Sequence, residues 1–349
     1  MAQNDTTNRQ LVLAQRPKGE PTKATLDLVV SKIPVAGENQ MLLRTEFLSL
    51  DPYMRGRMSD APSYTDQVDI GGVMIGGTVA QVVTSNIAGF QHGDWVLSFN
   101  GWQDFALSDG VGVTKLDQSS DQLSWALGVL GMPGFTAWAG LTQIGAPNPG
   151  ETIVVAAATG PVGATVGQIG KLLGCRVVGI AGGYDKSAYG VDELGFNACI
   201  NHKAPDFKEQ LAQVSPNGID VYFENVGGEV LDAVIPLLNP KARVQVCGLV
   251  SQYNVTKLPD GPDRINWLMG QILRKKIKVQ GFIVFEDFSH LYPDFLMEMG
   301  GWISSGKIKY REEIIDGLEN ASIAFTSLLK GENFGKCVIR VGQQTKETK

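Results

Sequence analysis

The stretch TIVVAAATGPVGATVGQIGKLLG, residues 152–174, carries the clearest structural pattern in this chain of 349 residues. Its first part, Thr152 to Ala158, is a short apolar run rich in β-branched side chains, which predicts a buried strand of a parallel sheet. A turn with Gly160 and Gly163 follows, and apolar residues then recur at helical spacing. We therefore expect a strand, a glycine turn and a helix here.

The predicted helix has an apolar face and a second face made of glycines, which we call the thin face because it carries no side chains. The apolar face contains Val162, Val166, Ile169 and Leu173, and the thin face contains Gly163, Gly167 and Gly170. The thin face suits close packing of the helix on the strand. Pro161 fits the first turn of the helix, and Gly174 fits its end. The first N–H groups of such a helix are bare, so they form an anion site, and the usual anion is a dinucleotide pyrophosphate.

The turn alone leaves two interpretations open. The full dinucleotide fingerprint is G-x-G-x-x-G, and Ala158 occupies the position of its first glycine. The alternative is a glycine-containing turn that binds no nucleotide. Further strand-like runs favour the nucleotide: Arg176–Gly182, Ala198–His202, Gly218–Val226, Arg243–Val250 and Lys278–Val284. Helix-compatible segments separate these runs, and this alternation predicts a doubly wound α/β sheet.

Composition excludes several classes of partner. The net charge is −6 and the pI about 5.2, without a basic cluster, which argues against nucleic acid and against anionic membrane surfaces. No apolar run is long enough to span a bilayer, and the N-terminus MAQNDTTNRQ lacks the apolar region of a signal peptide. The four cysteines are Cys175, Cys199, Cys247 and Cys337. They lie in or beside apolar runs, so we expect reduced, buried, structural thiols in a cytoplasmic protein.

The regions on either side of the α/β pattern look different. Short strand-like runs punctuated by Gly, Pro, Asn and Asp occur at Leu26–Ile33, Gln40–Leu50, Val73–Thr84, Asp94–Phe99 and Asp104–Ser108. They predict an all-β, barrel-like module. Beyond Gly306, the segment Ile314–Leu329 has helical character and Lys336–Val341 is typical of a last strand, which we expect to return to the first module.

The type of cofactor depends on the end of the second strand of the α/β part. NAD-binding proteins place an acidic residue there, but this strand ends in Gly182 and Gly183, and Asp185 lies beyond the glycines. Lys186 follows, and a compact ammonium beside a glycine turn suits the 2′-phosphate of NADPH. His202, at the end of the third strand, is a candidate second donor. The alternatives are a solvated surface lysine and a half-buried histidine.

The sequence lacks the residues of a zinc site. It has only three histidines, His92, His202 and His290, and no cysteine before Cys175, so a Cys/His zinc site in the N-terminal module is ruled out. This excludes zinc-assisted alcohol oxidation and leaves hydride transfer, a reaction in which the cofactor itself supplies the chemistry. Candidate proton donors or pocket residues are Tyr253, just past the fifth strand, and Tyr53 and Tyr64 in N-terminal loops. For each tyrosine, a pocket wall or a surface ring is the alternative.

Eight segments together resemble one family of oxidoreductases. They are LSLDPYMRGRM (48–58), GWQDFALSDG (101–110), LGMPGFTAWAGL (130–141), AAATGPVGATVGQIGKLLGC (156–175), VVGIAGGYDK (177–186), YFENVGGE (222–229), CGLVSQYN (247–254) and KGENFGK (330–336). The chain is similar to the zinc-independent medium-chain dehydrogenase/reductases. Within them it resembles the branch of prostaglandin reductase (leukotriene 12-hydroxydehydrogenase), plant alkenal double-bond reductases and, most of all, the bacterial curcumin reductase type.

The resemblance implies a fold, an activity and a set of contacts. It implies a GroES-like catalytic domain at 1–128, completed by 307–349, a Rossmann domain at 129–306, and an active site in the cleft between them. It implies NADPH-dependent reduction of the carbon–carbon double bond of α,β-unsaturated ketones and aldehydes. The implied cofactor contacts are Met132, Pro133, Thr136, Gly160, Pro161, Val162, Gly163, Gly182, Lys186, Asn225, Cys247, Gly248, Ser251, Tyr253, Phe282, Val284 and Asn333.

Two points of the resemblance are less direct. The family commonly has tyrosine where this chain has His202, after an apparent one-residue insertion, so the resemblance implies the phosphate contact of Lys186 but not one of His202. Homologues are usually dimers, which implies a homodimer here. Two other functions remain as alternatives: an NADPH quinone oxidoreductase, and a catalytically idle NADPH-binding structural protein.

Overall fold

The computed structural model describes residues 7–117, 122–257 and 263–342. The chain divides into two compact units: residues 1–127 with 312–349 form unit 1, and residues 128–311 form unit 2. None of the helices in the described ranges is long and apolar enough to cross a membrane.

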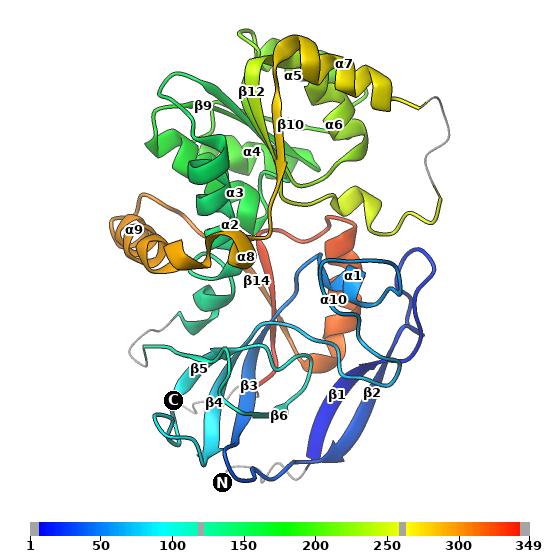
Figure 1. Cartoon of the computed structure of the whole chain (residues 1–349), viewed down its shortest axis with the longest axis vertical. Helices are drawn as coiled ribbons and strands as arrows, with labels where there is room; N and C mark the ends of the chain where they lie inside the picture. The colour runs from blue at the N-terminus through cyan, green and yellow to red at the C-terminus, as the bar shows by residue number, and fades with distance from the viewer. Residues whose placement is uncertain (1–6, 118–121, 258–262, 343–349) are drawn as a thin grey trace. The chain divides into compact units, whose positions relative to one another are not determined.

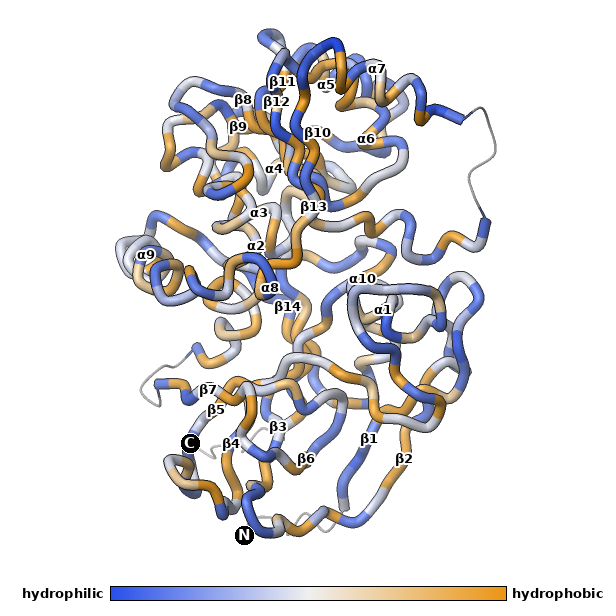
Figure 2. Tube along the Cα trace, in the orientation of Figure 1, coloured by the Kyte–Doolittle hydropathy of each residue, from blue (hydrophilic) through white to orange (hydrophobic). Residues whose placement is uncertain are grey.

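Unit 2 is built on a six-stranded parallel sheet in the order β10-β9-β8-β11-β12-β13. Its strands are β8 (Thr152–Ala156), β9 (Arg176–Ala181), β10 (Ala198–Asn201), β11 (Ile219–Glu224), β12 (Leu238–Val246) and β13 (Lys278–Gly281). The chain adds strands on one side of β8 and then crosses to β11 on its other side, which is the topology of a doubly wound sheet. The predicted α/β fold is therefore confirmed, and Figure 2 shows the hydrophobic residues concentrated along these strands.

Helices cover both faces of this sheet (Figure 1). The helices of unit 2 are α2 (Met132–Ala139), α3 (Pro161–Leu172), α4 (Tyr184–Asp192), α5 (Phe207–Val214), α6 (Gly228–Val234), α7 (Ile265–Lys275), α8 (Val284–Phe288) and α9 (Tyr292–Ser304), with a π-helical turn at Gly140–Gly145 after α2. Helices α3 to α7 pack on the strands, whereas α8 and α9 pack against α2. One buried cluster joins the sheet to α5, α6 and α7. On the other face, α3 packs on β8 and β9.

Gly163 and Gly170 of the thin face of α3 pack against the turn after β8 and against β8 itself, as predicted, whereas Gly167 packs against the ring of Phe196. A Cβ atom at Gly163 would stand 2.3 Å from the carbonyl oxygen of Ala157, and one at Gly170 would stand 2.7 Å from Cδ1 of Ile153. Because these distances are far below van der Waals contact, α3 can approach the strand this closely only without side chains at both positions. Pro161 begins the helix, and Gly174 follows its end in a left-handed conformation.

Unit 1 contains a mixed sheet in the order β14-β15-β3-β4-β5-β7, with β6 paired to β3, and a separate hairpin of β1 and β2. The strands are β1 (Thr7–Leu13), β2 (Leu26–Lys32), β3 (Met41–Ser49), β4 (Thr78–Ser85), β5 (Trp95–Ser98), β6 (Phe105–Ser108), β7 (Thr114–Lys115), β14 (Glu312–Asp316) and β15 (Lys336–Arg340). Its helical segments are α1 (Met54–Arg57), α10 (Ala321–Leu329) and 3₁₀ turns at Leu123–Leu127 and Leu318–Asn320. Two predictions are confirmed: the N-terminal part forms a separate β-rich module, and the last strand of the chain returns to it.

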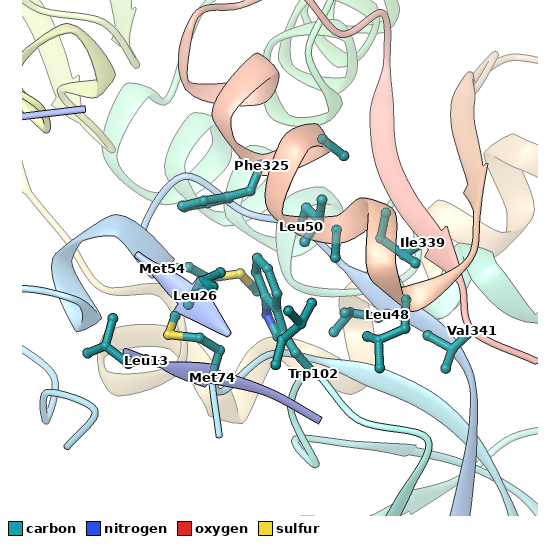
Figure 3. Packing of buried hydrophobic residues seen from close by; sticks show 14 of the residues in the cluster. Leu13, Leu26, Leu48, Leu50, Met54, Met74, Trp102, Phe325, Ile339 and Val341 are labelled. Carbon is teal, nitrogen blue, oxygen red and sulfur yellow. The ribbon is translucent and has the colours of Figure 1, made fainter. Parts of the chain in front are cut away.

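The core of unit 1 forms around Trp102, which is fully buried (Figure 3). Its ring meets Phe325 of α10 edge to face, with the ring centroids 5.7 Å apart. Met54 and Met74 pack on the same cluster. Residues from the two ends of the chain therefore share one hydrophobic core, which explains why the C-terminal segment returns to the first module.

The structure corrects the expectation of a helix over Ile314–Leu329. Its first residues belong to β14, where Ile314 pairs with Val338 of β15, and helix α10 begins only at Ala321. Gly317, with φ of 90°, separates the two elements. Short apolar runs of this kind do not distinguish strand from helix by periodicity, and pairing with β15 decides the outcome.

A buried ion pair ties β15 to the segment after β3. The ammonium of Lys336 donates to Oδ1 of Asp51 at 2.8 Å and to the carbonyl oxygen of Leu50 at 2.7 Å, and Lys336 is only 1% exposed. The hydroxyl of Ser49 donates to the other carboxylate oxygen of Asp51. Removing either ion alone would leave an uncompensated buried charge, so this pair fixes the backbone just before Tyr53.

Candidate functional site

The candidate cofactor site lies at the carboxyl edge of the parallel sheet, where β8, β9 and β11 end. Three helices begin there, with Gly160, Gly183 and Gly227 at the N-caps of α3, α4 and α6, and no side chain caps any of them. Bare N–H groups and the helix dipoles favour an anion at such an edge. The strand order also reverses at β8, which is where this class of fold binds dinucleotides.

The turn from β8 to α3 fits a pyrophosphate. It contains Gly160, Pro161, Val162 and Gly163, the four residues expected there. Just before it, Ala157 adopts a φ of 52°, which is unusual for a residue with a side chain. The close approach of Gly163 to the carbonyl oxygen of Ala157 holds this residue in its strained conformation.

The structure brings Gly182, Lys186 and His202 together beside the N-terminus of α4. A Cβ atom at Gly182 would stand 3.2 Å from Nε2 of His202 and 3.6 Å from Cε of Lys203, so both side chains lie against this glycine. Lys186 is half-buried on the first turn of α4, close enough to His202 to affect its pKa. Three potential cations therefore surround the end of β9.

The imidazole of His202 prefers its neutral form in this surrounding. Burial is the main reason that its pKa lies below the usual 6.5, and the positive charges of Lys203 and Lys186 lower it further, against the opposing effect of Glu229. At pH 7 the side chain therefore offers an N–H hydrogen bond but no positive charge to a phosphate.

On the other side of β8, two loops carry Asn225, Cys247, Gly248, Ser251 and Tyr253. The amide of Asn225 donates to the carbonyl oxygen of Ala156 at 2.8 Å, which joins the ends of β11 and β8. Ser251 donates to the carbonyl oxygen of Val226 at 2.6 Å. The hydroxyl of Tyr253 lies 3.3 Å from where a Cβ atom at Gly248 would stand, so the half-buried tyrosine ring folds back over its own loop.

The remaining unit 2 residues lie on α2 and at the start of α8. Pro133 is buried and Met132 and Thr136 are half-buried on α2, which packs against α3. Phe282 and Val284 are 8% and 6% exposed, and the ring of Phe282 packs against Phe223. Because that ring is part of the core, residues 282–284 have mainly their backbone to offer a cofactor.

Tyr53, Tyr64 and Asn333 belong to unit 1. Tyr53 occupies the N-cap position of α1 without a capping side-chain hydrogen bond, and the guanidinium of Arg57 lies 5.4 Å from the centre of its ring. Burial, followed by the charge of Asp51, raises the pKa of Tyr53 well above its usual value, and Tyr64 lies near enough to add to this shift. Tyr53 therefore keeps its proton and can act as a hydrogen-bond donor. The amide of Asn333 donates to the carbonyl oxygen of Gly335 at 2.8 Å.

Three residues at the carboxyl edge escaped the sequence interpretation: Asn201, Lys203 and Glu224. Oδ1 of Asn201 accepts from the N–H groups of Gly183 and Lys203, each at 3.0 Å, and so links β9 to β10. Glu224 is buried at the end of β11. The available signal was position, because all three lie within two residues of the end of a predicted parallel strand, where ligand-binding residues gather.

The cysteines bear on whether the protein could bind a metal ion, because thiolates are common metal ligands. The four cysteines form no disulfide, and Cys175 and Cys337 are buried, whereas Cys199 and Cys247 are only half-buried as whole residues. Burial raises the pKa of the Cys199 and Cys247 thiols to about 12 and that of Cys337 to about 11, so these thiols stay protonated and unreactive at neutral pH. Within the described ranges, no three His, Cys, Asp or Glu side chains are grouped to hold a metal ion.

Known proteins match this chain over nearly its whole length. Residues 9–116 match the family described as the N-terminal domain of oxidoreductase, and residues 161–299 match the zinc-binding dehydrogenase family. The chain is 60% identical to the NADPH-dependent curcumin reductase of Escherichia coli (strain K12), covering 98% of this chain and 99% of that protein. It is 38% identical to the 2-alkenal reductase (NADP(+)-dependent) of Nicotiana tabacum, covering 97% and 99%.

A solved structure gives the same result. The crystal structure of CurA in complex with NADPH from Vibrio vulnificus matches with a TM-score of 0.94 and 59% identity, covering 96% of this chain and 99% of that one. The chain belongs to the medium-chain dehydrogenase/reductase family of oxidoreductases. The zinc in one family description does not fit the residues present, since no cysteine precedes Cys175 and only three histidines exist.

The lowered pKa of His202 predicts a pH dependence of NADPH binding. A 2′-phosphate beside His202 would favour the imidazolium, so binding takes up a proton and the affinity rises as the pH falls toward the lowered pKa of the free protein, below 6.5. The gain is at most about tenfold per pH unit for one proton. It is measured by fluorescence titration from pH 8 to 5.5.

A His202→Gln variant is the matched control, because it keeps a hydrogen-bond donor but does not titrate. The 2′-phosphate of NADPH also titrates, but it does so equally for both proteins. The ratio of their NADPH affinities at each pH therefore reports the protonation of His202 alone. A ratio that stays constant over the whole range would show that His202 does not contact the 2′-phosphate.

Proposed function

We propose that this protein is an NADPH-dependent reductase of the carbon–carbon double bond in α,β-unsaturated ketones and aldehydes, including alkenals and curcumin-like dienones. The observation that supports NADPH as the cofactor is the uncapped glycine turn of α3, together with His202 against Gly182 and Lys186 near His202. The full-length similarity to a curcumin reductase and a 2-alkenal reductase supports the substrate class.

The residues of this chain would supply binding and proton chemistry. NADPH, when bound, supplies the hydride that reaches the β-carbon of the substrate. The substrate oxygen then carries enolate charge, which a hydrogen-bond donor stabilises, and the α-carbon needs a proton. We propose that Tyr253 serves one of these needs and that Tyr53 and Tyr64 line the substrate pocket. Tyr53 suits donation because its raised pKa keeps the phenol protonated.

An NADPH-oxidation screen tests the proposal against its two alternatives. We expect turnover with enals, enones and dienones, and a rate that chelators leave unchanged, because we propose that catalysis needs no zinc. Turnover of quinones alone would favour the quinone oxidoreductase, and turnover of neither class would favour an idle NADPH-binding protein. Stoichiometric zinc whose removal abolishes the rate would contradict the zinc-independent site.

Lys186→Ala tests the choice of NADPH over NADH. A charge-assisted phosphate contact is worth roughly 1.5–3 kcal/mol, so the variant should bind NADPH about 10–150-fold more weakly and NADH almost unchanged. Both dissociation constants are measured by fluorescence titration. An equal loss for the two cofactors would mean that Lys186 does not read the phosphate.

Tyr253→Phe tests the proton donor, because it removes only the hydroxyl and keeps the ring. If the hydroxyl donates a proton or stabilises the enolate, turnover should fall by about 100-fold or more while NADPH affinity stays constant. If water or a cofactor ribose hydroxyl supplies the proton, the loss should stay below about tenfold and Tyr253 is a pocket wall. Near-normal turnover with several enones would reject the catalytic role and leave the reductase assignment intact.

We also propose that the protein is a cytoplasmic homodimer. Ile265, Met269 and Leu273 form a stripe along α7 and are 65%, 56% and 79% exposed. Beside α7 lies β13, the edge strand of the sheet, whose Val279 is 47% exposed. An exposed apolar helix stripe next to an open sheet edge is typical of a surface that a second copy covers.

Replacing both Met269 and Leu273 by lysine should convert the dimer to a monomer, because buried charges would face each other across the interface. Light scattering after size exclusion measures the mass. Leu172→Lys, at a residue 39% exposed on α3, is the control and should leave the dimer intact. A monomeric native protein, or a double variant that remains dimeric, would contradict this interface.

A further inference from the structure

Glu224 is a buried carboxylate with an organised set of donors. It is 1% exposed at the end of β11. Oε1 accepts from the N–H groups of Val226 at 2.6 Å and Gly227 at 2.8 Å, and Oε2 accepts from the hydroxyl of Tyr222 at 3.0 Å. Two of the three donors belong to the loop that follows the strand, so the side chain folds that loop back over the sheet edge.

The backbone of Glu224 holds a second loop. Its carbonyl oxygen accepts from the N–H groups of Cys247 at 3.0 Å and Gly248 at 3.1 Å, just past the end of β12. The N–H of Val250 donates to the carbonyl oxygen of Asn225 at 3.2 Å, and that of Ser251 to Val226 at 3.1 Å. Residues 225–228 and 247–253 therefore form one unit, which we call the two-loop platform.

The glycines at the start of the platform make the anchor at Glu224 important. Gly227 and Gly228 both have positive φ, at 78° and 57°, and glycine pairs of this kind lose much conformational entropy when they are fixed. A buried carboxylate is stabilised only if its oxygens are hydrogen-bonded, and here the loop supplies the partners. Carboxylate and loop thus order each other.

We propose that Glu224 is a positioning residue that holds the two-loop platform in the conformation that binds the nicotinamide half of NADPH. This inference rests on the proposed function, because the platform carries Asn225, Ser251 and Tyr253, which we assign to the cofactor. Glu224 itself touches the cofactor at no point in this scheme. If the fraction of chains with a formed platform falls, the apparent affinity for NADPH falls in the same proportion.

Glu224→Asp and Glu224→Gln separate geometry from charge. Aspartate keeps the charge but is one methylene too short to reach both N–H groups, so NADPH should bind about tenfold more weakly or worse. Glutamine keeps the length and an acceptor oxygen, so it should bind within about threefold of the native protein. The opposite order of affinities would overturn the positioning role.

The NADPH fragment that lacks nicotinamide, 2′-phospho-ADP-ribose, shows which half of the cofactor is affected. Its affinity should be the same in the aspartate variant as in the native protein. Equal losses for NADPH and the fragment would indicate general damage to the site and would contradict the proposal. Failure of the proposed function is distinguishable, because the native protein would then bind NADPH weakly or not at all.

Two further experiments, a Tyr222→Phe variant and amide hydrogen exchange, test whether Glu224 positions the platform. Phenylalanine removes only the Oε2 partner, so the melting temperature should fall while NADPH affinity stays within threefold. In the native protein without cofactor, the amides of Val226 and Gly227 should exchange slowly. Fast exchange that slows only when NADPH binds would show that Glu224 does not preform the platform. Because this measurement uses the native protein, it tests the proposal even if the aspartate variant does not fold.

Discussion

The structure of the carboxyl edge depends on one close approach, that of Gly163 to the carbonyl oxygen of Ala157. Helix α3 lies against the end of β8 at a distance that leaves no room for a Cβ atom. This contact fixes where α3 begins and which way its bare N–H groups face. It also holds Ala157 in a left-handed conformation that an isolated chain would avoid. Packing of the helix on the strand therefore determines the conformation of the turn between β8 and α3.

The order of the strands separates two groups of residues around this turn. β9 and β10 lie on one side of β8, where His202 and Lys203 lie against Gly182 and Lys186 stands on the first turn of α4. β11 and β12 lie on the other side and carry the two-loop platform with Glu224 and Tyr253. A dinucleotide has a phosphate-bearing adenosine at one end and nicotinamide at the other. Our proposal assigns one end to each group, with the pyrophosphate between them at α3.

Much of this arrangement could be predicted from local pattern. The glycines of α3, the absence of an acid at the end of β9 and the alternation of strands and helices are properties of neighbouring residues, so they can be recognised in the sequence. The strand at Ile314 depends on pairing with β15, and the strand Thr7–Leu13 depends on pairing with β2, so neither is visible in its own segment. The role of Glu224 depends on contacts with three donors, and the ring of Tyr253 turns toward Gly248 through the conformation of a loop. The strand pairings arise only when distant segments meet, whereas the side-chain contacts of Glu224 and Tyr253 join residues two to five positions apart and depend on loop conformations that a local sequence pattern does not specify.

The central claim is that NADPH lies along this edge with its 2′-phosphate at Lys186. A crystal structure of this protein grown with NADPH tests that claim most directly. The account predicts the pyrophosphate at the N–H groups of Val162 and Gly163, and the 2′-phosphate within about 3.2 Å of the ammonium of Lys186. A pyrophosphate bound away from α3, or a 2′-phosphate that contacts only water, would contradict it.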